Sequence, residues 1–301
     1  NLIIFYRGIC MIKNTDITVL SRLHKTLALL SDIHYTENYS KKKLQEIYFN
    51  LKEHHPDYIC IVGDFFDQSI VLKEKTSKEI FLAWLEHISM IAPVIISIGN
   101  HDVALRNRKW KYQFPKEEID AIASIPNVSV LDNDSIVKDN ICFLGYTPPY
   151  TYYDNSPHEQ VEPYIDNIDQ KLKSHLREDC YQILLCHTPI YVTHPRVCET
   201  EVLRSIDLVL SGHMHRGIIP LKGNYGLISP CKKIFPKYAW GDFTIGNTQY
   251  VISGGVIAFS NVSPAVFHLF NFIHPPHIEY IHLSNVKKKH QDKNMKKRRN
   301  G

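Results

Sequence analysis

Apolar runs of strand length alternate with amphipathic segments of helix length over the first hundred residues. Residues 27–31, 58–62 and 94–98 are rich in leucine, isoleucine and valine, which is typical of buried strands. Between them, residues 40–54 and 76–88 place apolar side chains at the spacing of a helix with one buried face. This alternation of strand and helix predicts a parallel sheet built from βαβ crossovers.

The rest of the chain predicts further strands with shorter helices between them. Strands at residues 128–131, 135–137 and 141–145 surround an Asn-Asp turn and are expected to pair antiparallel. Residues 146–157 are dense in proline and aromatic side chains and predict a semi-rigid loop. Helices are expected at 116–123, 164–176 and 200–206, and strands at 2–6, 17–20, 183–186, 208–211, 218–221, 243–245, 250–253, 266–272 and 278–283. This pattern alone indicates a mixed α/β chain.

Polar clusters follow five of the predicted strands, at the carboxyl end of each strand. In open α/β sheets, binding sites form at this end. If the clusters are extended, alternate side chains point the same way, so Asp32 should converge with His34, and His213 with His215. So many imidazole and carboxylate groups suit two divalent cations. The clusters are Asp32-Ile33-His34, Gly63-Asp64-Phe65-Phe66-Asp67, Gly99-Asn100-His101-Asp102, His187 and Gly212-His213-Met214-His215.

The five clusters together resemble the motifs of the calcineurin-like metallophosphoesterase superfamily. Asp-x-His, Gly-Asp-x-x-Asp, Gly-Asn-His-Asp, a lone His and Gly-His-x-His are all complete and span residues 32–215. The resemblance implies an α/β fold, a four-layer α/β/β/α sandwich of two mixed β-sheets. Residues 235–241 and 276–281 resemble a bacterial subgroup of phosphohydrolases similar to UDP-2,3-diacylglucosamine pyrophosphatase.

The same resemblance implies a ligand set and a reaction. One metal would lie on Asp32, His34, Asp64 and His215, and a second on Asp64, Asn100, His187 and His213, with Asp64 bridging them. The ions would be Mn²⁺, Fe or Zn²⁺, a choice that the ligand types leave open. A hydroxide shared by the two ions would attack a phosphodiester or pyrophosphate bond without a covalent enzyme intermediate.

Other residues near the motifs carry predictions of their own. His101 is predicted as the general acid for the leaving oxygen, or as a cation that stabilises the transition state, with Asp102 orienting it. Asp67 is predicted to lie behind the ligands, with a turn or capping role as the alternative. Arg106 in a basic stretch and Tyr150 in the aromatic loop are predicted substrate contacts. An exposed loop and a cover for the core edge are the alternatives for these two stretches.

The charge composition of the chain limits the classes of molecule that it is expected to bind. The chain has 301 residues and a net charge of +4, with much of the excess in the last fifteen residues, so a globally basic nucleic-acid surface is not indicated. We expect a truncated N-terminal β segment at 1–24, because the chain begins with Asn1. A metallophosphoesterase domain at 25–284 and a basic disordered tail at 285–301 follow. The tail, or an anchor before Asn1, could contact a membrane.

The seven cysteines occur singly, which favours free thiols in a reducing compartment and a cytoplasmic or membrane-associated protein. Three other functions stay open beside cleavage of diesters or pyrophosphates. A nuclease is permitted by the basic stretch around Arg106, and a phosphomonoesterase is disfavoured because no Arg-Gly follows Asp67. A scaffold without catalysis would be expected to lack ligands, whereas all five motifs are complete.

Overall fold

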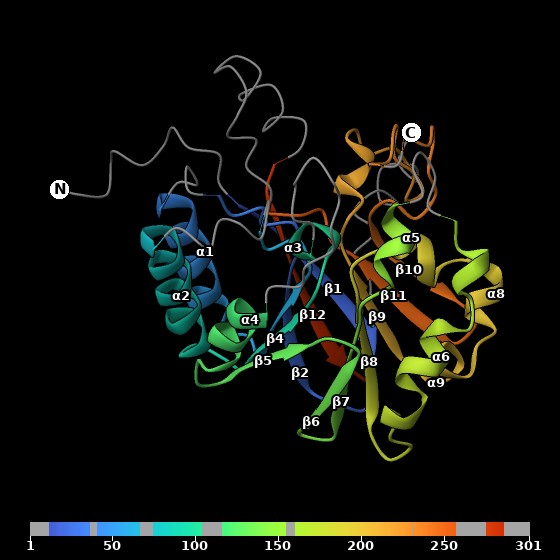
Figure 1. Cartoon of the computed structure of the whole chain (residues 1–301), viewed down its shortest axis with the longest axis horizontal. Helices are drawn as coiled ribbons and strands as arrows, with labels where there is room; N and C mark the ends of the chain where they lie inside the picture. The colour runs from blue at the N-terminus through green and yellow to red at the C-terminus, as the bar shows by residue number, and fades with distance from the viewer. Residues whose placement is uncertain are drawn as a thin grey trace, which may run out of the picture.

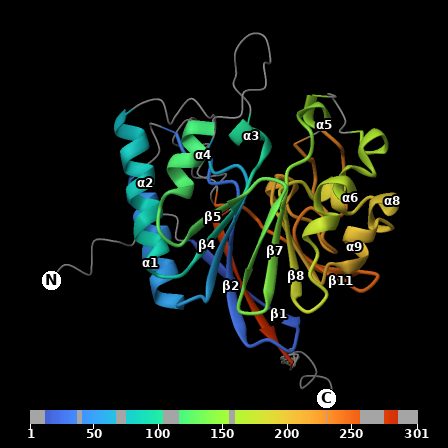
Figure 2. The same cartoon turned by 60° about the horizontal axis from the view of Figure 1, so that its bottom comes forward.

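Two six-stranded mixed sheets stack face to face, with helices on both outer faces (Figure 1, Figure 2). The computed structural model describes residues 12–36, 41–66, 75–103, 116–154, 160–230, 232–256 and 275–285. Between the sheets lies a core to which both contribute, for example Leu29 and Ile95 from one sheet and Ile183 and Leu210 from the other. This arrangement confirms the predicted four-layer α/β/β/α sandwich.

The first sheet has the order β1-β12-β2-β3-β4-β5. Strands β2 to β5 are parallel neighbours, as the βαβ pattern predicts, while β12 runs antiparallel to β2 and parallel to β1. The strands are β1 (Lys13–Leu20), β2 (Lys25–Leu30), β3 (Tyr58–Val62), β4 (Val94–Ser97), β5 (Val128–Leu131) and β12 (His277–Ser284), and the helices between them are α1 (Lys41–His54), α2 (Lys75–Ser89), α3 (Asn100–Val103) and α4 (Lys116–Ala123).

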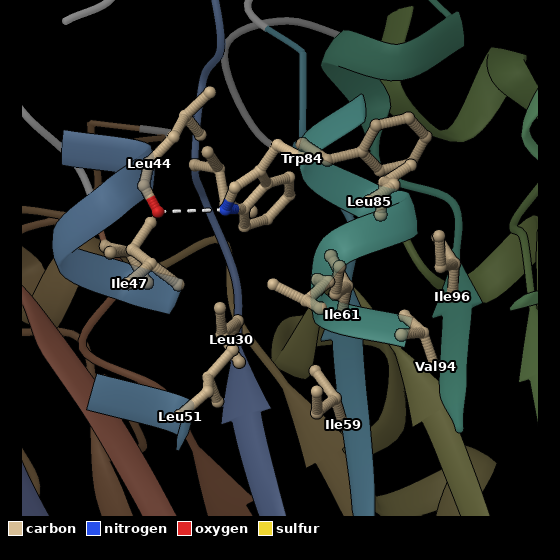
Figure 3. Packing of buried hydrophobic residues seen from close by; sticks show 14 of the residues in the cluster. Leu30, Leu44, Ile47, Leu51, Ile59, Ile61, Trp84, Leu85, Val94 and Ile96 are labelled. Carbon is tan, nitrogen blue, oxygen red and sulfur yellow. Dashed lines mark hydrogen bonds between the residues drawn. The ribbon is translucent and has the colours of Figure 1, made fainter. Parts of the chain in front are cut away.

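The long helices α1 and α2 cover the outer face of this sheet through a cluster of buried apolar side chains (Figure 3). Leu51 of α1 and Leu85 of α2 pack with Ile59 and Ile61 of the central strand β3, and all four are buried. The indole N–H of Trp84 donates a hydrogen bond of 2.9 Å to the carbonyl of Leu44 and so joins the two helices. These contacts hold the central strands, and therefore their carboxyl ends, in place.

The second sheet has the order β10-β11-β9-β8-β7-β6. Short helices cover its outer face, where Tyr152, Ile168 and Tyr191 are buried against Leu184 and Val209. Its strands are β6 (Asp134–Lys138), β7 (Ile141–Tyr146), β8 (Tyr181–Cys186), β9 (Leu208–Ser211), β10 (Gly241–Ile245) and β11 (Thr248–Ile252). Its helices are α5 (Tyr150–Asp154), η3 (Glu162–Tyr164), α6 (Asn167–Leu172), η4 (Lys173–His175), α7 (Pro189–Val192), α8 (Pro195–Cys198), α9 (Glu201–Ser205) and η5 (His215–Gly217).

One predicted strand pairing is wrong. Around the Asn-Asp turn, β6 does pair antiparallel with β7, but β5 pairs parallel with β4 in the other sheet. The turn at Asn133, which has a φ of 54°, therefore carries the chain from one sheet to the other. Val128 packs under the helices and Leu131 between the sheets, so burial selects the partner of β5 over the local turn signal.

Three other local predictions also differ from the structure. The aromatic loop contains helix α5, and the helix predicted at 164–176 is broken into α6 and η4. The strand predicted at 218–221 is reduced to a bridge between Pro220 and Gly226. The strands predicted at 2–6 and 266–272 lie outside the described residues. Within the described ranges, no helix is both long enough and apolar enough to cross a membrane.

Candidate metal centre

The polar clusters of both sheets meet at the carboxyl ends of their strands. The loops after β2, β3 and β4 come from the first sheet, and those after β8 and β9 from the second. Hydrogen bonds cross between them: the backbone N–H of His213 donates to Asp32 Oδ2 at 3.0 Å. His187 Nε2 lies 3.1 Å from Asp64 Oδ2. Clusters that are 181 residues apart in the chain, at Asp32 and His213, are therefore in direct contact.

The backbone at these ligands is left-handed, and the extended conformation expected from the sequence is wrong. Asp32, His34, Asp64, His213 and His215 all have φ between 45° and 67°. Asp32 and His34 still converge, with His34 Nε2 3.9 Å from Asp32 Oδ1, because the loop is turned back by contacts such as the 2.9 Å bond from the N–H of His34 to the carbonyl of Asp64. His213 and His215 do not converge on one point: His213 joins the group of Asp64 and His187, and His215 the group of Asp32 and His34. Non-glycine residues rarely adopt this conformation, and strain of this kind gathers at functional sites.

Two glycines of the motifs are required by close packing around the aspartates. A Cβ atom on Gly99 would lie 2.2 Å from Asp64 Oδ1, and one on Gly212 would lie 2.6 Å from Asp32 Oδ2. Both distances are far below van der Waals contact, so any larger residue would displace an aspartate. The glycines therefore let the backbone of one cluster come close to the carboxylate of another.

The side chains of the predicted ligands form two neighbouring groups. Ligand atoms of Asp32, His34 and His215 all lie within 4.8 Å of one another, and so do those of Asp64, His187 and His213. A third group of the same size joins Asp64 with His34 and His101. Asp64 therefore lies beside both main groups, where a bridging carboxylate would be needed. The assignment of these residues as ligands stays a prediction.

The side chain of Asn100 shows whether the predicted ligand atoms suit a metal ion. Its amide oxygen is buried and, within the part of the chain that the structure describes, accepts no hydrogen bond. Leaving a buried acceptor without a partner costs free energy unless a cation or water satisfies it. Imidazole nitrogens, carboxylates and one neutral amide oxygen are also a donor set suited to Mn²⁺, Fe or Zn²⁺. The residues present therefore fit divalent metal ions.

The electrostatics keep both aspartates ionised. Burial alone would raise the pKa of the Asp64 carboxyl, but His187 and His101 outweigh it and hold that pKa well below its usual value. The pKa of Asp32 is lowered in the same way, with burial opposed by His215 and His187. Burial works to lower the pKa of His187, yet Asp64 raises it to about 10. Two ionised carboxylates are thus buried at the centre, where a cation could replace the protons on the neighbouring imidazoles.

Asp102 holds the loops after β3 and β4 together. Its carboxylate accepts hydrogen bonds from the backbone N–H groups of Asp64, Phe66 and Gly99 at 2.8 to 2.9 Å. Burial is the main cause that raises its pKa to about 8, and the charge on Asp64 adds to this. These contacts show Asp102 positioning the two loops, while its predicted role in orienting the imidazole of His101 stays a prediction.

His101 lies beside the first ligand group. Its ring is 4.7 Å from that of His34 between centroids, and its backbone N–H donates to Asp64 Oδ1 at 2.8 Å. Tyr150 begins α5, and from the same helix the ring of Tyr153 lies 6.4 Å from that of His213. Asp67, Arg106 and the side chain of Tyr150 lie outside the described residues, so their predicted roles stay predictions.

Sequence reasoning missed Ser31. Its buried hydroxyl donates a hydrogen bond of 2.6 Å to Asp32 Oδ2, which fixes the carboxylate beside His34 and His215. Its position at the end of an apolar run, directly before the Asp-x-His motif, was the available signal. Tyr153 was missed as well, because its aromatic neighbours in the same stretch carry no spacing that separates one tyrosine from another.

Comparison with known families supports the geometry. A family model described as calcineurin-like phosphoesterase matches residues 25–217, which is more than half of the chain. The chain belongs to this family. The match covers all five polar clusters and ends two residues after His215. Membership in the calcineurin-like phosphoesterase family confirms the superfamily predicted from the sequence motifs.

Two curated relatives within the family come from Helicobacter pylori, and both are named uncharacterized metallophosphoesterase. The protein of strain 26695 is 29% identical over 219 residues, which cover 71% of this chain and 52% of the relative. That of strain J99 is 28% identical over 259 residues, covering 83% of this chain and 60% of the relative. The chain therefore spans only about half to three-fifths of the length of these calcineurin-like relatives.

Solved structures similar to this family member are more distant. A phosphopantetheinyl hydrolase from Mycobacterium tuberculosis is 13% identical with a TM-score of 0.40, covering 77% of this chain and 90% of its own. A dimetal phosphatase from Danio rerio is 12% identical with a TM-score of 0.41, covering 77% and 88%. A Pseudomonas putida nuclease is 18% identical with a TM-score of 0.33, covering 79% and 80%.

Proposed function

We propose that this chain is a metal-dependent hydrolase that uses two divalent cations to cleave phosphodiester or pyrophosphate bonds. The observation that carries the proposal is a pair of neighbouring ligand groups in a member of the calcineurin-like phosphoesterase family: Asp64 belongs to one group and lies 3.8 Å from His34 of the other. One group of three would suit a single structural or catalytic ion. Two groups that share a buried carboxylate as their neighbour favour a binuclear centre.

The residues that would hold the ions follow from the two groups. Asp32, His34 and His215 would bind one ion, and His187, His213 and the unpartnered amide oxygen of Asn100 the other. Asp64 would contribute to both. When bound, such a pair of cations supplies an activated water and neutralises charge on the phosphate. The mixed imidazole, carboxylate and amide donors suit Mn²⁺, Fe or Zn²⁺.

His101 is the chain's own candidate for proton transfer. Neither main ligand group includes His101, and its side chain is partly exposed beside them. An imidazole so placed can donate a proton to the leaving oxygen. The bond from its backbone N–H to Asp64 fixes its position relative to the centre. Asp102 keeps the loop that carries it tied to the loop after β3.

The proposed substrate is defined by its chemical class and not by a single compound. Residues 235–241 and 276–281 resemble the subgroup similar to UDP-2,3-diacylglucosamine pyrophosphatase, which favours a small or lipid-linked diphosphate. The near-neutral charge outside the tail argues against nucleic acid as the main substrate. The proposed partner is therefore a phosphate ester or pyrophosphate that reaches the centre from solution or from a membrane surface.

Hydrolysis of two aryl phosphates tests the proposed activity. The full chain is assayed with an aryl phosphodiester and an aryl phosphomonoester, first with Mn²⁺ and then with a chelator. We expect turnover that is faster for the diester and abolished by the chelator. Preference for the monoester would assign the chain to the phosphatases instead. No turnover of either compound by protein that has bound metal would favour the scaffold alternative.

A further inference from the structure

The chain between β9 and β10 displays an unusual number of exposed apolar side chains. Among the described residues, ten large apolar side chains are exposed, and six of these fall within 18 consecutive positions. Their exposed fractions range from 37% to 65%, with the largest at Ile234 and Phe235. The six are Ile218, Ile219, Tyr225, Ile228, Ile234 and Phe235, and together with the lysines described next they are called the 218–237 surface.

This surface is also positively charged. Lys222, Lys232, Lys233 and Lys237 lie on it, and all four are exposed. From Leu208 to Gly241 the chain contains no aspartate or glutamate. Neutralising partners are therefore missing from the segment itself. Exposed apolar patches on a soluble chain usually mark an interaction site, and a patch interleaved with lysines favours an anionic partner.

The apolar side chains are held outward by an ordered backbone. Leu227 and Ile228 donate their N–H groups to the carbonyl of Gly217 at 3.0 and 3.1 Å, and Phe235 donates to the carbonyl of Leu227 at 2.9 Å. The indole of Trp240 donates to the carbonyl of Tyr225 at 3.0 Å. These hydrogen bonds fix the conformation of the segment, and in this conformation its isoleucine side chains are exposed. The exposure is a property of its folded conformation.

The segment that carries this surface begins directly after the candidate metal centre. Gly217, which anchors it, lies two residues after His215, and a Cβ atom on Gly226 would lie 2.4 Å from the Cα of Gly217. The orange chain of this region extends from the sheets at the end where α3 and α5 also lie (Figure 1). The part of the 218–237 surface around Gly226 therefore lies beside the segment that carries His215.

We propose that the 218–237 surface docks the protein on an anionic lipid membrane. Ile234 and Phe235 would enter the boundary between headgroups and acyl chains, and the lysines would contact the anionic headgroups around them. A second copy of the chain fits less well, because pairing this surface with itself would bring eight lysines together. The docking orients the predicted centre towards the membrane, where phosphate esters of lipids are found.

Vesicle sedimentation with the full chain tests the docking. Binding is measured on phosphatidylcholine vesicles with and without about one-third phosphatidylglycerol, at low and high salt. The apolar variant combines Ile234→Ser with Phe235→Asn, since asparagine tolerates the φ of 49° at position 235. The charge variant combines Lys222→Gln with Lys233→Gln. The matched control combines Phe49→Ser with Met90→Ser, two exposed apolar residues from the region of α1 and α2.

We expect binding only to the anionic vesicles, weakened about tenfold or more in both surface variants and unchanged in the control. Melting temperature and hydrolysis of the soluble aryl diester should stay unchanged in all variants, which separates lost docking from lost folding. The measurement needs no turnover, so the docking can fail or succeed independently of the proposed function.

Three results would overturn the docking. The first is no binding of the wild type, and the second is equal binding of the wild type and both surface variants. The third is a loss of binding only in a tail variant with Lys296, Lys297, Arg298 and Arg299 replaced by glutamine, which would assign the contact to the tail. If the first result is accompanied by a concentration-dependent dimer that Ile234→Ser dissociates, the surface is assigned to a second copy.

Discussion

Five of the seven predicted metal ligands hold a left-handed backbone, for which a non-glycine residue loses about 1–3 kcal/mol of stability. Such a strained backbone conformation is maintained only where the surrounding structure imposes it. Here the bonds from the N–H of His34 to Asp64 and from the N–H of His213 to Asp32 do so. The loops therefore direct their side chains into two neighbouring groups, an arrangement suited to metal ligation.

Asp64 is the residue whose loss should affect both ligand groups. Asp64→Asn keeps the size of the side chain and an oxygen that can accept from the N–H of His101, but it removes the negative charge. We expect metal content and turnover to fall together, turnover by more than about 100-fold, because a ligand should matter at least as much as the residues behind it. Elemental analysis and initial rates measure this.

The exposed Asp242→Asn on β10 is the matched control for this substitution and should change neither quantity. Unchanged turnover in Asp64→Asn would contradict the bridging role. Loss of turnover with full metal content would instead place Asp64 in a later step.

His101 can be separated from the ligands by its kinetics. His101→Ala should keep the metals and lower turnover by about 10²–10⁴-fold, because only proton transfer to the leaving oxygen is removed. The loss should grow as the leaving group becomes more basic, which a series of aryl diesters measures. His87→Ala, at an exposed site on α2, is the control. An equal loss for good and poor leaving groups would argue against the general-acid role.

At the scale of elements, buried carboxylates hold separate segments of the chain together through hydrogen bonds. Asp102 does so between the loops after β3 and β4, and Glu279 does so between β12 and the chain after β11. Glu279 accepts hydrogen bonds from Ser253 Oγ at 2.7 Å and from the N–H of Gly254 at 2.9 Å. Burial raises its pKa to about 7, although these two bonds and Arg216 oppose the rise.

Stability should therefore depend on the ionisation of Glu279. Because its pKa is raised on folding, the folded protein binds this proton more tightly than the unfolded chain does. The resulting stability is fully present below the ordinary pKa of 4.5 and is lost as the pH rises through about 7. The loss amounts to about 3 kcal/mol. Glu279→Gln should reduce the fall in the free energy of unfolding between pH 5 and 7, measured by urea denaturation.

The exposed Glu117→Gln on α4 serves as the reference for this pH dependence and should leave the fall unchanged. If the Glu279 variant shows the same fall as the wild type, another group carries the pH dependence.

Across the whole molecule, the sequence correctly predicted the elements that depend on the local spacing of apolar and polar residues. The strands β2, β3 and β4 and the helices α1 and α2 follow from apolar spacing, and the ligand loops from motifs at the strand ends. Tertiary burial decides the rest. Residues 128–131 join the first sheet across a turn that looked like a hairpin, and the left-handed ligand backbones arise from contacts between distant loops. Neither the sheet partner of residues 128–131 nor the left-handed ligand backbone can be deduced from the spacing of residues along the chain.

The number of metal ions bound per chain tests the central claim most directly. The purified chain is freed of metal, reconstituted with Mn²⁺ or Zn²⁺ and analysed for bound metal, with circular dichroism as a check on folding. The two ligand groups predict two ions per chain in the wild type and fewer in Asp64→Asn. A folded wild-type chain that binds one ion or none under saturating metal would contradict the binuclear centre.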